Sequence, residues 1–206
     1  MGERATEQQR RVWDQQAPRY DRQIAFWERV WFPGGREWIG ARAHGRVLEV
    51  AIGTGLNLDH YSPGVTVTGV ELSPEMLARA RERAGSGVTL LVGDAERLPV
   101  EDAAYDTVVC CLALCSIPDP ARALAEMHRA LVPGGQLLLV DHVGSTWPPL
   151  YAAQWLAERV TVPFAGEHFT RRQRPHVERA GFEVVETERL RAGTVERVRA
   201  RRPAAP

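Results

Sequence analysis

The chain has 206 residues, a length that suits one α/β domain built around a single core. Basic and acidic residues balance at 26 each, so the sequence lacks the excess of positive charge that nucleic-acid-binding domains usually carry. No lysine is present, which excludes P-loop kinases and pyridoxal enzymes because both need one. We therefore expect no nucleic-acid partner.

The first residues carry charges where a secretory signal needs an apolar core, and no later stretch is long and apolar enough to span a bilayer. We therefore expect a cytoplasmic protein. The cysteines Cys110, Cys111 and Cys115 lie in or just after one apolar run, without a CxxC pair or a histidine cluster. We interpret them as buried, reduced thiols and expect no metal site; a metal- or arsenic-binding thiol site is the alternative.

From residue 46 onward, short β-rich runs alternate with amphipathic helical runs, a pattern typical of a parallel sheet with helices on both faces. A strand at 46–50 leads into a glycine-containing turn and a short helix at 56–60. Ser73 and Pro74 predict the start of a helix that ends near residue 84, since they supply a side-chain cap and a proline at the first helical position. Further strands are expected at 65–71, 88–92, 105–112 and 136–143.

A helix with its apolar face at 121–131 should end at the run PGG at 133–135, and another helix is expected at 170–180. Alternating runs at 182–190 and 194–200 predict an antiparallel hairpin. The whole is an α/β fold with a mostly parallel sheet of seven strands, helices on both faces and an N-terminal helical cap. We expect a single domain, 1–206, in which 1–42 is the cap, 46–143 the core and 144–200 further helices and the hairpin. Only 201–206 is expected to be disordered.

The strongest chemical signal is the pattern Glu-x-Ala-x-Gly-x-Gly, formed by Glu49, Ala51, Gly53 and Gly55 between a strand and a helix. The acid Glu71 ends the next strand. Glycines in such a turn let the backbone pass close to a nucleotide-like ligand, and a carboxylate at the tip of the second strand can accept both ribose hydroxyls. The combination predicts adenosine binding, with a tight turn and a surface glutamate as the structural alternative. It does not by itself separate a dinucleotide from S-adenosylmethionine.

Successive motifs extend this pattern along the chain: VLEVAIGTG at 47–55, GVELSPEML at 69–77, GDAERLP at 93–99, YDTVV at 105–109 and LVPGGQLLL at 131–139. In this order they resemble the motifs of class I S-adenosylmethionine-dependent methyltransferases. Within that superfamily the chain is most similar to the branch of ubiquinone and menaquinone C-methyltransferases, bacterial phosphatidylethanolamine N-methyltransferases and methyltransferase-like thiol methyltransferases. The resemblance implies a Rossmann-like fold with 144–200 on the substrate side. It also implies S-adenosyl-L-methionine as cofactor and S-adenosyl-L-homocysteine as product.

The resemblance also implies roles for individual residues. Gly53 and Gly55 would line the methionine end of the cofactor, Glu71 would hold the ribose, and Asp94 with Ala95 would contact the adenine. We expect the cofactor-binding set to be Glu49, Ala51, Gly53, Thr54, Gly55, Asn57, Glu71, Leu72, Met76, Asp94, Ala95 and Leu112.

The sequence departs from the family pattern at two places. Family members commonly have glycine where Ala51 stands and a third small residue near Asn57, so the loop is bulkier here. This disfavours a dinucleotide, because a pyrophosphate needs the closest backbone approach. The segment CLALCSIP at 111–118 lacks the Asn/Asp-Pro-Pro-aromatic signature of enzymes that methylate the exocyclic amines of bases. Nucleobase methylation is therefore disfavoured.

Methyl transfer from a sulfonium asks little of the protein, because in-line positioning of the nucleophile supplies much of the acceleration. A general base is required only if the acceptor must lose a proton. The candidate bases are His142, at a strand end where ligands of open α/β sheets gather, and Tyr20 or Asp21 near the N-terminus. A structural histidine is the alternative at 142. Cys115 and Ser116 are expected to line the pocket.

The N-terminal segment is rich in aromatic residues and arginine. Trp13, Trp27, Trp31 and Trp38 are four of the six tryptophans in the chain. Aromatic residues with arginine at helical spacing are typical of peripheral contact with a membrane interface. A lid helix that packs on the core and covers the site explains the same residues and is the favoured interpretation, and the two roles are compatible.

These observations predict S-adenosylmethionine-dependent methyl transfer to a small-molecule or lipid-like acceptor. The amine of phosphatidylethanolamine is the favoured acceptor, and a soluble thiol, a quinone or a natural product is the alternative. An NAD-dependent oxidoreductase on the related fold and a non-catalytic adenosine-ligand sensor are the other classes that the residues leave open. The sequence predicts no oligomeric state.

Overall fold

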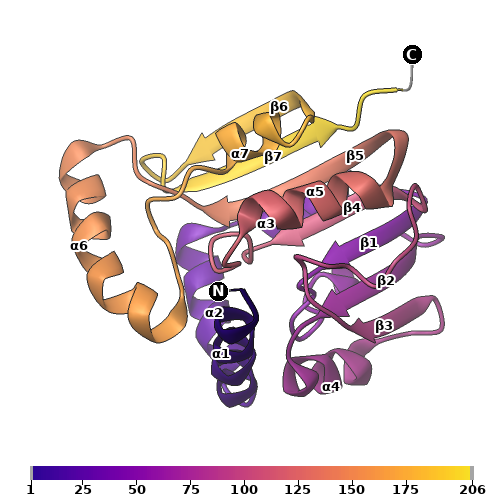
Figure 1. The fold of residues 1–206 in the computed structure, drawn as a ribbon, viewed down its shortest axis with the longest axis horizontal. Coiled ribbons are helices and arrows are strands. Elements are labelled where there is room, and N and C mark those ends of the chain that lie inside the picture. The colour runs from indigo at the N-terminus through magenta and orange to yellow at the C-terminus, as the bar shows by residue number, and fades with distance from the viewer. Residues whose placement is uncertain (1, 205–206) are drawn as a thin grey trace.

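A seven-stranded sheet forms the centre of the computed structural model, which describes residues 2–204 (Figure 1). The strand order is β3-β2-β1-β4-β5-β7-β6. Strands β1 to β5 run parallel, whereas β7 is antiparallel to both β5 and β6. This confirms the expected Rossmann-like α/β sheet with an antiparallel C-terminal hairpin. The strands are β1 (Arg46–Val50), β2 (Thr66–Glu71), β3 (Val88–Val92), β4 (Tyr105–Cys111), β5 (Leu131–His142), β6 (Glu183–Leu190) and β7 (Val195–Arg201).

The central strands place alternate residues in two apolar cores, one on each face of the sheet. Val108 of β4 packs in one core and its neighbour Val109 packs in the other. Helices α5 (Pro120–Ala130) and α7 (Gln173–Arg179) cover the first face, and α3 (Gly35–Gly40) with the 3-10 helix η1 (Leu58–His60) covers the second. Burial on both faces explains why these strands are almost continuously apolar.

Helix α4 (Pro74–Arg83) begins as the sequence predicts. The Ser73 hydroxyl oxygen accepts a hydrogen bond from the Met76 N–H at 3.1 Å, and Pro74 occupies the first turn. Met76, Leu77 and Ala80 are buried, in agreement with the predicted inward face. The helix packs on β2 and β3 and so brings its N-terminus to the carboxyl edge of the sheet.

Two further helices, α1 (Gly2–Gln16) and α2 (Tyr20–Trp31), form with α3 the expected N-terminal cap (Figure 1). Helix α1 packs against α4. The cap thereby lies beside the carboxyl ends of the first strands, where ligands of open α/β sheets bind.

The structure differs from the predictions in several elements. Helix α6 (Pro148–Ala165) occupies a segment for which no helix bounds were predicted. Strand β5 begins at residue 131 instead of 136, and η1 is shorter than the predicted helix. No helix within residues 2–204 is both long and apolar enough to cross a membrane.

The prediction of a disordered tail is wrong for its first residues. Arg201 is the last residue of β7, and the Arg202 N–H donates to the Gly135 carbonyl at 2.9 Å. The Arg202 guanidinium also donates to the carbonyls of His128 and Arg129. These acceptors lie in β5 and in the last turn of α5, and they hold the first residues of the tail in place. Residues 205–206 lie outside the described part.

Candidate active site

The loop after β1 has a backbone that only particular residues adopt without strain. Gly53 and Gly55 have φ of 60° and 81°, in the left-handed region that favours glycine. A Cβ on Gly53 would meet no atom within 4 Å, so this side of the loop faces open space. Ala51 has φ of 55°, which costs an L-residue about 1–2 kcal/mol. The departure from glycine at Ala51 therefore adds backbone strain as well as bulk.

The Glu71 carboxylate is fixed at the end of β2 by backbone donors. One oxygen accepts from the Gly53 N–H at 3.0 Å and the other accepts from the Ser73 N–H at 2.9 Å. Burial raises the pKa of Glu71, and these backbone hydrogen bonds oppose that rise. A carboxylate oxygen accepts about two hydrogen bonds, so each keeps a position for another donor. The carboxylate is therefore preorganised to accept two hydroxyl groups.

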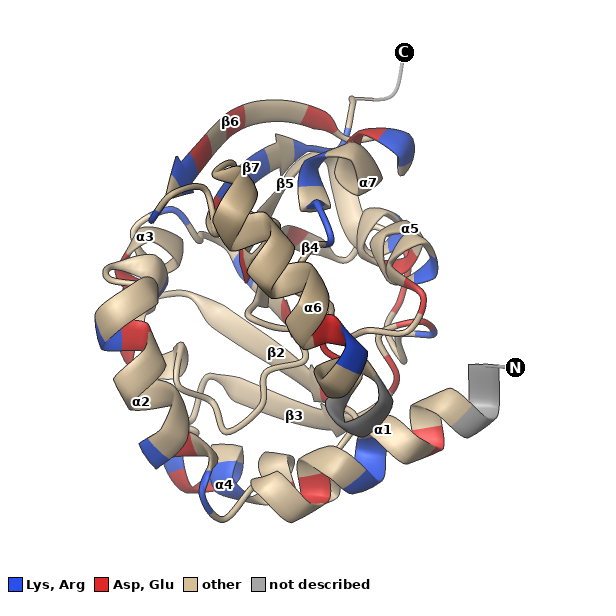
Figure 2. Cartoon of the chain, turned by 90° about the vertical axis from the view of Figure 1, so that its left-hand side faces the viewer, with Lys and Arg blue, Asp and Glu red and all other residues tan. Residues whose placement is uncertain are grey.

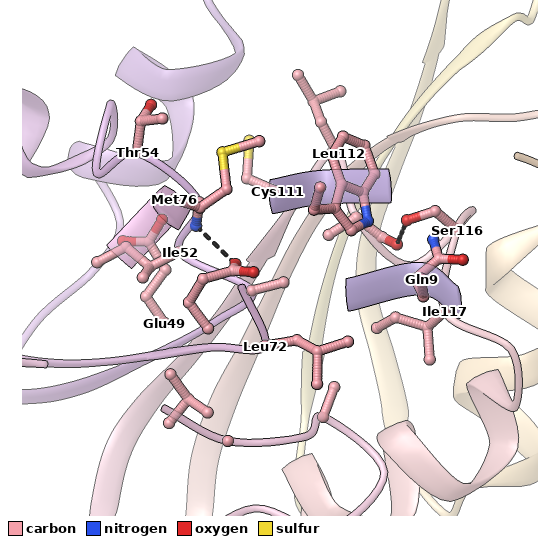
Figure 3. A pocket seen from close by; sticks show the side chains of 18 of the residues that line it. Gln9, Glu49, Ile52, Thr54, Leu72, Met76, Cys111, Leu112, Ser116 and Ile117 are labelled. Carbon is pink, nitrogen blue, oxygen red and sulfur yellow. Dashed lines mark hydrogen bonds between the residues drawn. The ribbon is translucent and has the colours of Figure 1, made fainter. Parts of the chain in front are cut away.

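A cavity of about 850 Å³, counted with its opening to solvent, lies at the carboxyl edge of the sheet. We call it the cofactor cavity. Figure 3 shows Ile52 and Met76 on one side of it and Leu112 and Ile117 on the other. Ten of the predicted cofactor-binding residues lie in its wall: Glu49, Ala51, Gly53, Thr54, Glu71, Leu72, Met76, Asp94, Ala95 and Leu112.

Two predicted cofactor-binding residues, Gly55 and Asn57, are not in that wall. A Cβ on Gly55 would lie 3.3 Å from Ala80, so this glycine allows the loop to pack on α4. The fully buried Asn57 side chain donates to Glu49 at 2.7 Å and accepts from Arg36 at 2.7 Å. Both residues therefore support the loop from behind, an arrangement that spacing alone does not show.

Glu49 belongs to a buried polar network behind the same loop. Its carboxylate accepts from Asn57 and from the Tyr61 hydroxyl, the latter at 2.8 Å. Burial raises the pKa of Glu49 to about 7, although these hydrogen bonds and the nearby Arg36 favour the charged form. Arg36 also donates to Glu28 and lies in the cavity wall. No motif indicates Arg36, because it is one of many arginines and reaches the site through α3.

The N-terminal cap closes one side of the cofactor cavity. Trp13 of α1 and Tyr20 of α2 lie in its wall, together with Thr6 and Gln9. The Ser73 hydroxyl donates to Asp14 of α1 at 2.6 Å, which joins this helix to the start of α4. Helix α1 therefore lies against the core beside this cavity, and its role as a lid stays a prediction.

A second cavity adjoins the first. Tyr20, Leu112 and Ser116 lie in the walls of both, and the second wall also contains His142 and Glu167. His142 and Glu167 also border a third, mainly apolar space next to α2 and α6. We call the second and third spaces together the acceptor cavity. The wall contacts indicate one continuous path from the cofactor cavity past Tyr20 to His142.

The candidate bases differ in their surroundings. The buried Nδ1 of His142 has no hydrogen-bond partner among the described residues, and the Phe169 ring lies 4.8 Å from the imidazole ring, centroid to centroid. Burial raises the pKa of Tyr20 well above its usual range, so this hydroxyl stays protonated and suits hydrogen bonding better than proton abstraction. Asp21 lies outside both cavity walls, 2.6 Å from Arg83. The arrangement therefore favours His142.

Glu167 is a site residue that the sequence did not indicate. It lies in the loop after α6, away from every motif, and burial raises the pKa of its carboxyl group. The nearby His142 opposes this rise. The two side chains thus present an imidazole and a carboxyl group to the same cavity.

The cysteines match the interpretation as reduced thiols. Cys110 and Cys115 are buried and Cys111 is half-buried in the cofactor-cavity wall. Ligand atoms of Cys115, Asp141 and His142 lie within 4.8 Å of one another. However, Asp141 already accepts from the Cys115 N–H at 2.8 Å, and burial raises the pKa of the Cys115 thiol. Both observations favour a protonated thiol over a metal-binding thiolate.

Comparison with known proteins fixes the family. Residues 48–139 match a family described as a methyltransferase domain. The chain is 35% identical over 164 residues to a demethylmenaquinone methyltransferase of Thermus thermophilus, and the match covers 73% of each protein. The chain belongs to the S-adenosylmethionine-dependent methyltransferases.

The methyltransferase also resembles proteins with other named acceptors. A phosphatidylethanolamine N-methyltransferase of Cereibacter sphaeroides is 43% identical over 121 residues, but the match spans only 59% of that protein and 56% of this chain. The human thiol S-methyltransferase TMT1A is 32% identical, with 84% of this chain and 74% of the relative covered. A solved S-adenosylmethionine-dependent methyltransferase of Thermotoga maritima shares the fold, with a TM-score of 0.73 at 24% identity over 94% of this chain and 99% of that one.

S-adenosylmethionine is thus the cofactor of the methyltransferase, and the residues fit it. The buried Glu71 carboxylate keeps acceptor positions for two ribose hydroxyls, and the open side of Gly53 leaves room beside the loop. The acidic Glu49 lies in the same wall and suits the amino group of the cofactor. The role of each residue stays a prediction.

Proposed function

We propose that the methyltransferase methylates the amine of an amphipathic, lipid-like acceptor, and that phosphatidylethanolamine is the first compound to test. The observation that carries this proposal is the pair His142 and Glu167, which faces a mainly apolar cavity next to the cofactor cavity. The similarity to a phosphatidylethanolamine N-methyltransferase supports the same choice.

The polar end of the cavity suits a cationic group. An amine is protonated at neutral pH, and the Glu167 carboxylate stabilises such a cation while it disfavours a thiolate or phenolate. Bound S-adenosylmethionine supplies an electrophilic methyl group on its sulfonium. The amine must lose a proton before its electron pair can form the new N–C bond, and the unpartnered Nδ1 of His142 can accept that proton.

Tyr20 lies at the junction of the two cavities, where the acceptor nitrogen must come to rest. Its protonated hydroxyl can donate to a polar atom of the acceptor and so hold it in line. Leu112, beside it, has φ of 54°, a strained conformation for leucine that directs the turn after β4 into the junction. These residues position the acceptor and keep water away from the reacting atoms.

The remaining wall suits an apolar chain. Side chains from α2, α6, the loop after α6 and β7 form it, and they are mainly aromatic or aliphatic: Ile24, Trp27, Trp31, Phe32, Leu150, Phe169 and Val195. Burial of such surface stabilises a bound hydrocarbon by about 25 cal/mol per Å². A short polar amine would leave this part of the cavity unused.

A labelled-methyl assay tests the proposal. Phosphatidylethanolamine, a demethylated menaquinone and an aryl thiol are offered in the same detergent micelles, each at the same concentration. We expect label in the phospholipid, and we expect Glu167→Gln to lower that rate. Rapid labelling of the quinone or the thiol, with none in the phospholipid, would contradict the amine assignment.

A further inference from the structure

Helix α6 differs from a typical surface helix, since the polar side chains of Gln154 and Glu158 point toward the protein and its large apolar side chains are exposed. The Gln154 amide accepts from the Ser145 N–H at 2.7 Å and donates to the Val143 carbonyl at 3.1 Å. The Glu158 carboxylate accepts from the Thr170 N–H at 2.6 Å. These bonds fix which face of the helix is turned toward the protein.

The outward face of α6 is consequently apolar. Its exposed large apolar side chains, counted with that of the residue before the helix, are Trp147, Tyr151, Trp155, Leu156 and Val160. Leu156 and Val160 are 61% and 62% exposed. Outside α6 and α2, the large apolar side chains exposed in the described part of the chain are Val92 and Val185. Figure 2 shows α6 free of charged residues along most of its length.

The charge on this face is positive. Arg159 lies among the apolar residues of α6, with its guanidinium 3.5 Å from the centre of the Trp155 ring. Arginine stacked on tryptophan is typical of side chains that lie at a membrane interface.

Helix α2 also combines exposed apolar side chains with arginine. Arg22, Phe26, Arg29 and Val30 are exposed and share one helical face, because their spacing is that of i, i+4, i+7 and i+8. The acids of the helix do not cancel this charge: Asp21 is paired with Arg83 and Glu28 with Arg36. The exposed face of α2 therefore carries apolar side chains and positive charge together.

We propose that the outward faces of α6 and α2 form a docking surface for an anionic lipid bilayer. Exposed tryptophan and tyrosine place their rings at the headgroup level of a bilayer, and arginine is attracted by anionic headgroups. A protein partner would explain the apolar residues but not the arginines without acids beside them. The charge complementarity therefore selects an anionic membrane.

The docking surface is continuous with the acceptor cavity. Trp27 of α2 and Leu150 and Gln154 of α6 lie in the cavity wall. A bilayer on these helices would bring the hydrocarbon chain of a lipid to the cavity opening. This last step rests on the proposed function, whereas docking itself does not need the acceptor.

Vesicle flotation tests the docking surface without the reaction. The vesicles contain phosphatidylcholine with phosphatidylglycerol, and neither phosphatidylethanolamine nor cofactor is added. The double variant Leu156→Ser/Val160→Ser removes apolar contact, and Val92→Ser/Val185→Ser makes a matched change elsewhere on the surface. We expect the parent and the matched control to float, the α6 variant to bind about tenfold more weakly, and binding to fall at high salt.

A second variant separates charge from apolar contact. Arg22→Gln/Arg29→Gln should weaken binding to the anionic vesicles and remove most of its salt dependence. Circular dichroism and bound S-adenosylhomocysteine check that each variant is folded. Failure of the parent to float at low salt, or equal flotation of the α6 variant and its control, would overturn the proposal. So would a dimer in sedimentation that the α6 substitutions dissociate, which would assign this face to a second copy of the chain.

Discussion

The Thr54 hydroxyl donates a hydrogen bond to Asp21 across 2.6 Å, and this contact ties the cofactor loop to helix α2. Arg83 of α4 donates to the other Asp21 oxygen at 2.6 Å and to the Thr54 carbonyl at 2.8 Å. Asp21 thus joins three of the elements that enclose the cofactor cavity. We call these three hydrogen bonds the latch, because they hold the cofactor loop, the cap and α4 together.

Loss of this latch should loosen the cavity. Asp21→Asn removes the charge that pairs with Arg83 while it keeps the shape of the side chain, so we expect S-adenosylhomocysteine to bind about three- to tenfold more weakly, mainly through faster dissociation. Stopped-flow dissociation measures this. Asp59→Asn, on the exposed surface of η1, is the matched control. Equal dissociation rates for the two variants would show that the latch does not slow the release of S-adenosylhomocysteine.

The buried Glu49 should make stability depend on pH. Its pKa is raised from 4.5 to about 7, so the native state holds a proton that the unfolded chain releases, and stability falls as the pH rises from about 4.5 to about 7. Glu49→Gln removes this loss. We expect the difference in melting temperature, variant minus parent, to increase by on the order of 5 °C across that range. Above it, the difference should stay nearly constant. A difference that does not vary with pH would contradict the assigned pKa.

Substitution of His142 or Glu167 in the acceptor cavity should change the rate of methyl transfer or the KM for the acceptor, and should leave the affinity for the cofactor unchanged. His142→Ala is expected to lower the rate of methyl transfer about 10²-fold or more, since a general base contributes that much. Glu167→Gln should raise KM for an amine acceptor. Calorimetry with S-adenosylhomocysteine should find parent-like affinity in both. A parent-like rate in His142→Ala would make this histidine structural.

Much of the fold follows from local pattern. Strands β1 and β3 have the predicted bounds because each is a short apolar run between turn residues, and the N-terminus of α4 is encoded by Ser73 and Pro74. The bounds of helix α6 were not predicted, because its large apolar residues face outward and no amphipathic pattern points to the core. Arg202 is ordered through partners distant in sequence.

The site residues also fall into two groups, those that local sequence pattern predicts and those that only the path of the whole chain brings together. Residues within motifs, such as Glu71 and Asp94, lie in the cofactor cavity because strand and loop together place them. Asn57 lies behind the loop, although it stands in the same motif region. Arg36 and Glu167 reach the site from α3 and from the loop after α6, and only the path of the whole chain brings them there.

The most direct test of the cofactor site is calorimetry of S-adenosylhomocysteine and NAD with the parent, with Glu71→Ala and with Glu82→Ala, an exposed acid of α4. We expect S-adenosylhomocysteine to bind and NAD not to bind, because Ala51 narrows the loop that a pyrophosphate would need. Glu71→Ala should lose about 2–4 kcal/mol of binding free energy, since it leaves two ribose hydroxyls without their charged acceptor, and Glu82→Ala should lose none. Tight binding of NAD with no binding of S-adenosylhomocysteine, or parent-like binding by a folded Glu71→Ala variant, would show that the cofactor site is wrongly assigned.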